Sequence, residues 1–507
     1  MTSSDDNEME LQKPHSSEPP IDNNSETSIH RGEFLQSELC LKEPLWNLWS
    51  FLLLSVATFC VLWSLTGDMM LPYKDAGYLF TIFLIYLAAV ILSKLAILLK
   101  MPGLVGMLIA GIAVRQLPIP AIDNSSGISS SLRNSAFAII LIRAGMSLDL
   151  KSIFRLKKTV FLLTFVPGCT VEASVVAVIS YFILDFPLIW GFILGFILAA
   201  VSPAVVVPSL IALQERGLGV EQGIPSLIIA AASLDDICAI LGFSLAFDIC
   251  MATGNATSYI MLLVELIGGV ALGVFLGLLI YIFPPLKSQN TISSKKFFIT
   301  ILLICVVFVL GASRLDARGA GPLSCLIFAV IVGRKNPAVS EVMESWFKQL
   351  WQLLMPFLFG LIGYEVDLLV VMNIRALLCV LVITVGLIFR VAASFLCTFG
   401  SNLNWREMLF VAVAWSPKAT VQAAIGSVPL DYIKSHNVKT ENYEAYASDV
   451  LTTAVLAILL TAPLGAIAIQ LLGRKLLRTG LQSQLDEKVE SGSPQTENEK
   501  QIKQSET

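Results

Sequence analysis

Two adjacent carboxylates, Asp235 and Asp236, lie in the middle of the apolar stretch AASLDDICAILG, residues 231–242. An acid at the centre of a membrane-spanning helix costs about 2.5–3.5 kcal/mol even on the mildest scale. Desolvation and like charge disfavour the ionised form of such a pair, so it can take up protons, and carboxylate oxygens also suit small hard cations. Protons and a cation would therefore compete for these groups. Competition at a site that opens alternately to either side of a membrane is antiport.

Four further ionisable residues interrupt apolar stretches: Arg143, Glu172, Arg390 and Lys418. Glu172 and Arg390 are 218 residues apart and occupy equivalent positions in the internal repeat described below. Their opposite charges predict a structural ion pair, with two separate cavity-facing charges as the alternative. Lys418 follows a predicted helix break, where a cation offsets the partial negative charge of a helix C-terminus, and it can also face the two aspartates.

The elements that carry these charges are predicted to be membrane helices. The chain has 507 residues, of which 55% are hydrophobic and 14% charged, and its mean hydropathy is +0.76. A spanning helix needs about 20 mostly apolar residues. Hydropathy predicts fourteen such segments: 45–66, 76–99, 101–117, 133–149, 159–184, 187–213, 223–251, 258–283, 297–313, 320–333, 346–370, 375–399, 405–428 and 447–472.

The distribution of basic residues predicts the orientation. Lys and Arg gather in the even-numbered connections, which places both termini on the cytoplasmic side. Asn124 and Asn255, each in an N-x-S/T acceptor, then fall on the outer side. Residues 1–44 and 480–507 are polar and are predicted to be disordered cytoplasmic tails around the transmembrane domain, residues 45–479. We expect the plasma membrane, with endosomal or mitochondrial membranes as alternatives.

An internal repeat relates the two halves of the chain. FILAAVSPAVVVPSL (196–210) recurs as FVAVAWSPKATVQAA (410–424), and the same offset of 214 residues sets Asp235 against Asp449. An odd number of intervening spans turns the copies in opposite directions, which predicts inverted repeats over about 76–251 and 297–472.

Helix breaks are predicted within the repeated Ser-Pro stretches, because proline lacks a backbone donor. Discontinuous helices in both halves point to a binding site at the membrane midplane, with proline-kinked packing helices as the alternative. Backbone or side-chain groups at the breaks are expected to support the ion site: Ser202, Pro203, Val205, Val206 and Lys418.

Several stretches resemble the cation/proton antiporter superfamily, specifically the animal NHA subfamily of sodium/hydrogen exchangers (solute carrier family 9, subfamily B). They are ILIRAG, WGFILGF, AVSPAVVVPS, SLDDICAI, PFLFGLIG and PKATVQAAIGSV, and the resemblance covers nearly all of residues 45–475. It implies an all-α polytopic membrane protein with an NhaA-like antiporter fold. That fold has about 14 transmembrane helices in inverted repeats, two crossed discontinuous helices, a six-helix core and a dimerisation domain.

The resemblance also assigns roles to residues. Asp236 is similar to the principal ion and proton carboxylate, with Asp235 as its partner, and Na+ or Li+ would bind there. Glu172 with Arg390 resembles the structural ion pair, and Lys418 the lysine at the helix crossover. Some bacterial members carry a titrating lysine where this chain has Arg390, and arginine does not deprotonate in proteins, which favours electroneutral exchange. Homodimers and elevator-type movement are implied in the same way.

These observations predict a secondary active Na+(Li+)/H+ antiporter in a lipid bilayer, and not an enzyme. No cofactor and no nucleic-acid partner are expected. The alternatives are a proton-coupled chloride or anion transporter that uses Arg143, Arg390 and Lys418, a sodium-coupled organic-solute carrier, and a non-transporting membrane scaffold. The intact Asp235 and Asp236 disfavour the scaffold.

Overall fold

The computed structural model describes residues 50, 53–71, 77–99, 101–119, 122, 128–146, 157–251, 256–282, 291–315, 320–334, 337–366, 374–401, 403–436, 440 and 442–478. Both expected tails and the acceptors Asn124 and Asn255 lie outside these residues. The chain divides into two units, residues 1–67 and 68–507. The first unit contributes a helix over residues 53–66, and the second contains the site.

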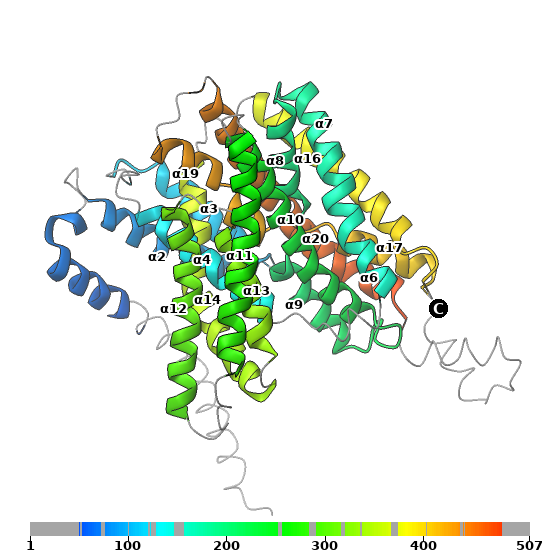
Figure 1. Ribbon diagram of the computed structural model, residues 1–507, viewed down its shortest axis with the longest axis horizontal. Coiled ribbons are helices and arrows are strands. Elements are labelled where there is room, and N and C mark those ends of the chain that lie inside the picture. The colour runs from blue at the N-terminus through cyan, green and yellow to red at the C-terminus, as the bar shows by residue number, and fades with distance from the viewer. Residues whose placement is uncertain are drawn as a thin grey trace, which may run out of the picture. The chain divides into compact units, whose positions relative to one another are not determined.

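Helices form the regular structure of the described residues (Figure 1). In chain order they are η1 (Gly67–Met70), α2 (Tyr78–Leu98), α3 (Gly103–Arg115), α4 (Ile128–Met146), α6 (Lys157–Thr164), η3 (Phe165–Glu172), α7 (Ala173–Ile183), α8 (Leu188–Ala199), α9 (Pro203–Gln214), α10 (Ile224–Met251), α11 (Ala256–Ile282), α12 (Thr291–Arg314), α13 (Ala320–Gly333), α14 (Pro337–Glu365), α16 (Ile374–Cys397), α17 (Trp405–Ala414), α18 (Thr420–Ile425), α19 (Val428–Ser435) and α20 (Tyr443–Leu476).

Nine helical stretches within the described residues are long and apolar enough to cross a membrane. The other five of the fourteen predicted segments are also helical, but each departs from a regular apolar span. The apolar helices α3 and α13 are short. The longer helices α4 and α14 carry several Ser or charged residues, and the segment 405–428 is divided into α17 and α18. An all-helical polytopic membrane protein is therefore confirmed, whereas the count of fourteen spans is not.

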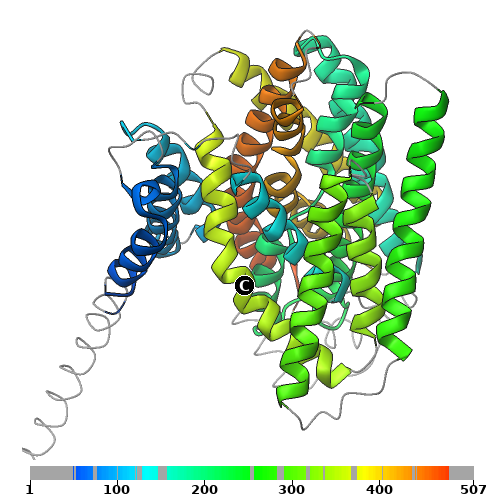
Figure 2. The same cartoon turned by 60° about the vertical axis from the view of Figure 1, so that its left-hand side comes forward.

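Two groups of helices can be distinguished in the second unit (Figure 1). The scaffold group contains α2, α3, α4, α11, α12, α13 and α14, which pack mainly against one another. The site group contains α6 to α10, η3 and α16 to α20. Figure 2 shows α11 at the edge of the scaffold group, where much of its surface is uncovered.

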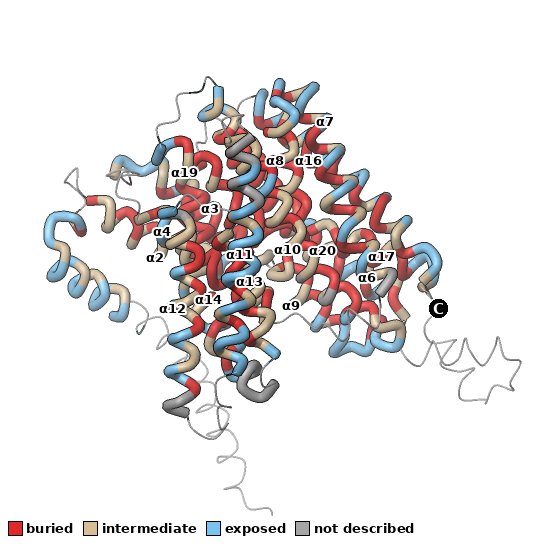
Figure 3. Tube along the Cα trace, viewed as in Figure 1, coloured by how far each residue is buried: buried red, intermediate tan, exposed pale blue. Residues whose placement is uncertain are grey.

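Burial separates the helices that surround the site from those at the periphery (Figure 3). In the most apolar window of the α8–α9 stretch 61% of the residues are buried, and in that of α10 62%, against 17% in α11. Asp235 and Asp236 on α10 are themselves buried within the protein.

Both repeated Ser-Pro stretches contain a helix break. Residues 200–202 separate α8 from α9, and residues 415–419 separate α17 from α18. Pro203 is the first residue of α9, a position whose N–H has no partner within the helix, whereas Pro417 lies inside the longer second break. Pro208 lies within α9 and does not end it, so only one of the two prolines in SPAVVVP marks the break.

A π-helical segment, η3, interrupts the predicted helix 159–184 between α6 and α7. Such segments are rare and frequently occur at functional sites. Gly168 lies within it, and a Cβ atom there would stand 2.7 Å from the carbonyl oxygen of Ala199 and 2.8 Å from Oδ1 of Asp235. Glycine therefore permits the close approach of η3 to the first helix break and to α10.

Candidate functional site

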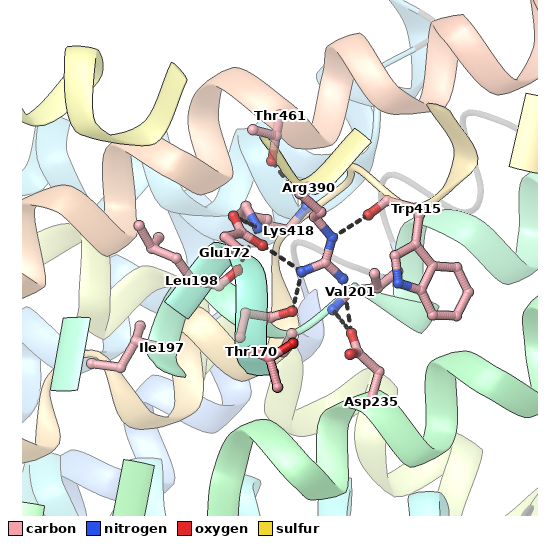
Figure 4. Close-up of polar contacts among 12 residues, drawn as sticks. Thr170, Glu172, Ile197, Leu198, Val201, Asp235, Arg390, Trp415, Lys418 and Thr461 are labelled. Carbon is pink, nitrogen blue, oxygen red and sulfur yellow. Dashed lines mark hydrogen bonds and ion pairs between the residues drawn. The ribbon is translucent and has the colours of Figure 1, made fainter. Parts of the chain in front are cut away.

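Five buried ionisable side chains converge from separate elements of the site group. Glu172 ends η3, Asp235 and Asp236 lie on α10, Arg390 on α16, and Lys418 in the break between α17 and α18. Each is at most 3% exposed. Figure 4 shows Arg390 between Glu172 and Asp235, with Lys418 close to Glu172. The structure thus brings together all five charges that the sequence singled out for the site.

Glu172 binds both cations. Its Oε2 lies 2.5 Å from Nη1 of Arg390, and its Oε1 lies 2.6 Å from Nζ of Lys418. The expected contact between Glu172 and Arg390 is therefore present, but it is not an isolated pair. Lys418 faces Glu172 directly, rather than the two aspartates.

Arg390 links four groups. Besides Glu172, its Nη2 donates to Oδ2 of Asp235 at 2.9 Å, its Nε donates to the carbonyl of Trp415 at 2.7 Å, and its Nη1 also donates to the carbonyl of Ala199. The planar guanidinium suits this arrangement, because its donors point in fixed and different directions. The sequence predicted that Arg390 forms only a structural pair with Glu172. In the structure the same arginine also binds Asp235, one of the two adjacent aspartates.

The two aspartates differ in their partners. Oδ2 of Asp235 accepts hydrogen bonds from Arg390 and from the N–H of Val201, each at 2.9 Å. No hydrogen bond or ion pair joins Asp236 to another described residue, and its buried Oδ1 has no partner among them. Oδ1 of Asp235 is likewise buried without a partner in this part of the chain. The carboxylate of Asp236 and Oδ1 of Asp235 are therefore the aspartate oxygens of the cluster that have no partner among the described residues.

The carbonyls at the C-terminal end of α8 receive their hydrogen bonds from the second half of the chain. The last four C=O groups of a helix lack partners within it. Gln422 donates to Ile197 and Ala200 at 2.9 Å each, Lys418 donates to Leu198, and Arg390 donates to Ala199. Lys418 thus lies at a helix C-terminus, as its charge suggested, but at that of α8.

The two breaks contact each other directly. The N–H of Ser202 donates to the carbonyl of Pro417 at 2.8 Å, and the N–H of Thr420 donates to Oγ of Ser202 at 3.4 Å. The N–H groups of Val205 and Val206 donate to the carbonyl of Ser202 at 3.2 and 3.1 Å, within the first turn of α9. The backbone oxygens expected to surround an ion are therefore partly used inside α9.

Two other candidate charges lie away from this cluster. Arg143 belongs to α4 of the scaffold group and interacts electrostatically with Glu344 of α14. Asp449, the repeat counterpart of Asp235, pairs with Arg375, whose Nε lies 2.7 Å from Oδ2 of Asp449. Both repeats therefore pair an aspartate with an arginine of α16.

Sequence reasoning missed three contributors to the site: Gly168, the N–H of Val201 and Gln422. Gln422 left one usable signal, since it is a large amide inside the apolar stretch ATVQAAIG. The other two depend on how closely separate helices approach, which hydropathy does not encode.

Comparisons with known proteins agree on one family. A family model described as "Sodium/hydrogen exchanger, transmembrane" matches residues 79–475. Sodium/hydrogen exchanger 9B2 of Xenopus tropicalis is 38% identical over 480 residues, which cover 90% of this chain and 88% of that protein. The human protein of the same name is 40% identical over 446 residues, covering 86% and 81%, and human sodium/hydrogen exchanger 9B1 is 38% identical over 432 residues, covering 83% and 81%.

A solved structure shares the fold. The sodium proton antiporter MjNhaP1 from Methanocaldococcus jannaschii at pH 8 superposes with a TM-score of 0.64 and 20% sequence identity. The match covers 78% of this chain and 98% of that one.

Proposed function

Because the chain belongs to the sodium/hydrogen exchanger family, whose members are transporters and not enzymes, we propose that it exchanges Na+ or Li+ for protons with Asp236 as the exchanging carboxylate. The proposal rests on the difference between the site's three acids. Glu172 and Asp235 are each paired with a cation, whereas Asp236 has no hydrogen-bond or ion-pair partner among the described residues. A group that alternates between a proton and a cation needs this freedom.

In the proposed cycle, ionised Asp236 binds the cation together with Oδ1 of Asp235, and the backbone of the crossed breaks supplies further oxygens. The site group then moves against the scaffold group in an elevator-like manner and exposes the ion to the other side. Release of the cation lets Asp236 take a proton for the return. Arg390 balances the charge of Asp235 throughout, so one cation exchanges for one proton without net charge movement.

The contacts weigh against a proton-coupled anion transporter. Arg390 and Lys418, which would have to face the anion, are already bound by Glu172 and Asp235. Arg143 lies in the other helix group. A permeant anion would have to displace buried carboxylates from their partners, which is costly at this depth.

The wider architecture is proposed on the same basis. We infer fourteen spans in inverted repeats, both termini in the cytoplasm, and a homodimer in the plasma membrane. The matching positions of the two helix breaks in the repeated Ser-Pro stretches support the repeat.

A proteoliposome assay of sodium-driven pH change tests the exchange site. Asp236→Asn should abolish proton movement driven by Na+ or Li+ gradients while the protein remains folded. Asp449→Asn provides the matched control, since Asp449 is the repeat counterpart of Asp235 but lies away from the charge cluster, and it should retain transport. Undiminished exchange in Asp236→Asn would overturn the assignment.

The same assay identifies the ion and the stoichiometry. Gradients of Na+, Li+, K+ and Cl− are compared with the membrane potential clamped and unclamped. Electroneutral exchange predicts equal rates under both conditions. Proton movement that follows a Cl− gradient instead would establish the anion alternative.

A further inference from the structure

We propose that Gln422 is a positioning residue of the exchange site, which orients the Ala200–Val201 peptide group and thereby the carboxylate of Asp235. This inference rests on the proposed function, because it concerns how the site binds its cation. Gln422 lies on α18, the half-helix that follows the second break, and its side chain approaches the first break from there.

Both amide protons of Gln422 are committed. Its Nε2 donates to the carbonyl of Ile197 and to that of Ala200, at 2.9 Å each. The residue is 1% exposed, so water does not compete for these donors. An amide nitrogen has two protons, and the two carbonyls use both of them.

The carbonyl of Ala200 and the N–H of Val201 belong to one peptide group. This N–H donates to Oδ2 of Asp235 at 2.9 Å. Because a peptide group is planar and rigid, a hydrogen bond that fixes its oxygen also fixes the direction of its N–H. A hydrogen bond to the oxygen further polarises the group, which strengthens the N–H as a donor.

The position of this peptide group in the break makes Gln422 necessary. Residues 200–202 lie between α8 and α9, so no continuous helix holds their backbone. Asp235 has two donors on the same oxygen, Arg390 and Val201, and these two set where its unpartnered Oδ1 points. Without Gln422 the carbonyl of Ala200 loses its side-chain donor, and the direction of the Val201 N–H is then set only by Asp235 and by the hydrogen bonds of the neighbouring peptide groups.

Gln422 differs in this respect from the other two side chains that bind the end of α8. Lys418 and Arg390 are charged and bind acids directly. Gln422 is neutral, and it reaches the acid only through the peptide group. A change at Gln422 should therefore alter ion binding more than maximal turnover.

The test is Gln422→Met, which preserves side-chain volume and removes both donors. Loss of one hydrogen bond to a charged group predicts that the Na+ concentration for half-maximal exchange rises about tenfold, with the maximal rate within about twofold of the parent chain.

Ser394→Ala is the matched control. Ser394 is buried on the same helix as Arg390, and its hydroxyl has no partner among the described residues. This variant should leave both the half-saturating Na+ concentration and the maximal rate unchanged. Gln422→Glu provides a second variant, in which carboxylate oxygens face two carbonyls, and it should weaken Na+ binding more than Gln422→Met does.

A double-mutant cycle separates positioning from general destabilisation. Na+-dependent thermal stabilisation is measured for the parent chain, Gln422→Met, Asp235→Asn and the combination. If Gln422 acts through Asp235, adding Gln422→Met to Asp235→Asn changes Na+ stabilisation no further. Additive losses, or Gln422 variants that behave like Ser394→Ala, would overturn the inference. Absence of sodium-driven pH change in the parent chain would instead contradict the proposed function.

Discussion

At the scale of single residues, Arg390 organises the site. It binds two carboxylates and two carbonyls from four other parts of the chain, and it is fully buried. Buried charges are tolerated when partners and hydrogen bonds compensate for their desolvation. Glu172, in turn, forms ion pairs with both Arg390 and Lys418. The cluster is therefore a network in which no pair can be exchanged alone.

A charge swap tests this network. Combining Glu172→Arg with Arg390→Glu should not restore the stability lost in either single variant. A carboxylate at position 390 would face Asp235, and a guanidinium at position 172 would face Lys418. The yield of monodisperse protein and its unfolding temperature measure the outcome. Recovery of parent stability in the double variant would show that Glu172 and Arg390 form an independent pair.

Arg390→Lys tests the role of the forked guanidinium. A lysine ammonium keeps the charge but cannot reach four groups in fixed directions. The free energy of unfolding should fall by about 3 kcal/mol or more, as when a buried pair is broken. Arg375→Lys is the control, because Arg375 is 45% exposed and its pair with Asp449 should contribute at most about 1 kcal/mol. Equal losses in both variants would contradict the special role of Arg390. Thermal unfolding in detergent provides the comparison.

At the scale of elements, the π-helical segment and the two breaks set the positions of these side chains. Gly168 in η3 packs against the break after α8 and against Asp235. A Cβ atom added at Gly168 would also stand 3.0 Å from Nη1 of Arg390. The surrounding atoms belong to backbone and to a buried ion pair, so they have little room to move.

Gly168→Ala should therefore destabilise the fold by about 1–3 kcal/mol through overpacking. It should also reduce the rate of sodium-driven exchange. Gly268→Ala is the matched control, because no atom lies within 4 Å of a Cβ at this position of α11. Unfolding temperature and exchange rate are compared for both variants. A Gly168→Ala protein as stable and active as Gly268→Ala would mean that η3 tolerates displacement from α10.

The sequence predicted the elements better than their detailed connections. Hydropathy located the helices, because apolar length is a local property, and the repeated Ser-Pro stretches located both breaks. The repeat offset also suggested the contact between Glu172 and Arg390. The sequence did not predict that Arg390 reaches Asp235 or that Gln422 binds the end of α8, since these contacts depend on the approach of helices more than 150 residues apart.

At the scale of the whole molecule, ion pairs join the two helix groups. Arg133 of α4 lies 2.6 Å from Asp431 of α19 and 3.7 Å from Glu365 of α14. Lys434 of α19 lies 3.9 Å from Glu365. If the site group moves against the scaffold group, the ion pairs of α19 with α4 and α14 must break during each cycle.

Cross-linking tests this movement. Cysteines that replace Arg133 and Asp431, joined by a short reducible reagent, should arrest sodium-driven exchange, and reduction should restore it. The control pair replaces Arg375 and Asp449, which are 2.7 Å apart on α16 and α20, both within the site group. Its cross-link should leave exchange largely intact. Arrest by the control alone would contradict movement of the site group as one body.

The hydrogen bonds at the end of α8 also have a consequence for synthesis of the chain. All of them come from residues 390–422, about 200 residues after the carbonyls that they bind. At about 5–20 residues per second, the ribosome needs on the order of ten to forty seconds to make that stretch. During this interval the first repeat has reached the membrane with the end of α8 lacking its final partners. Biogenesis must then keep these carbonyls hydrated or shielded until the second repeat arrives, and a nascent chain stopped before residue 390 should be a preferred target for quality control.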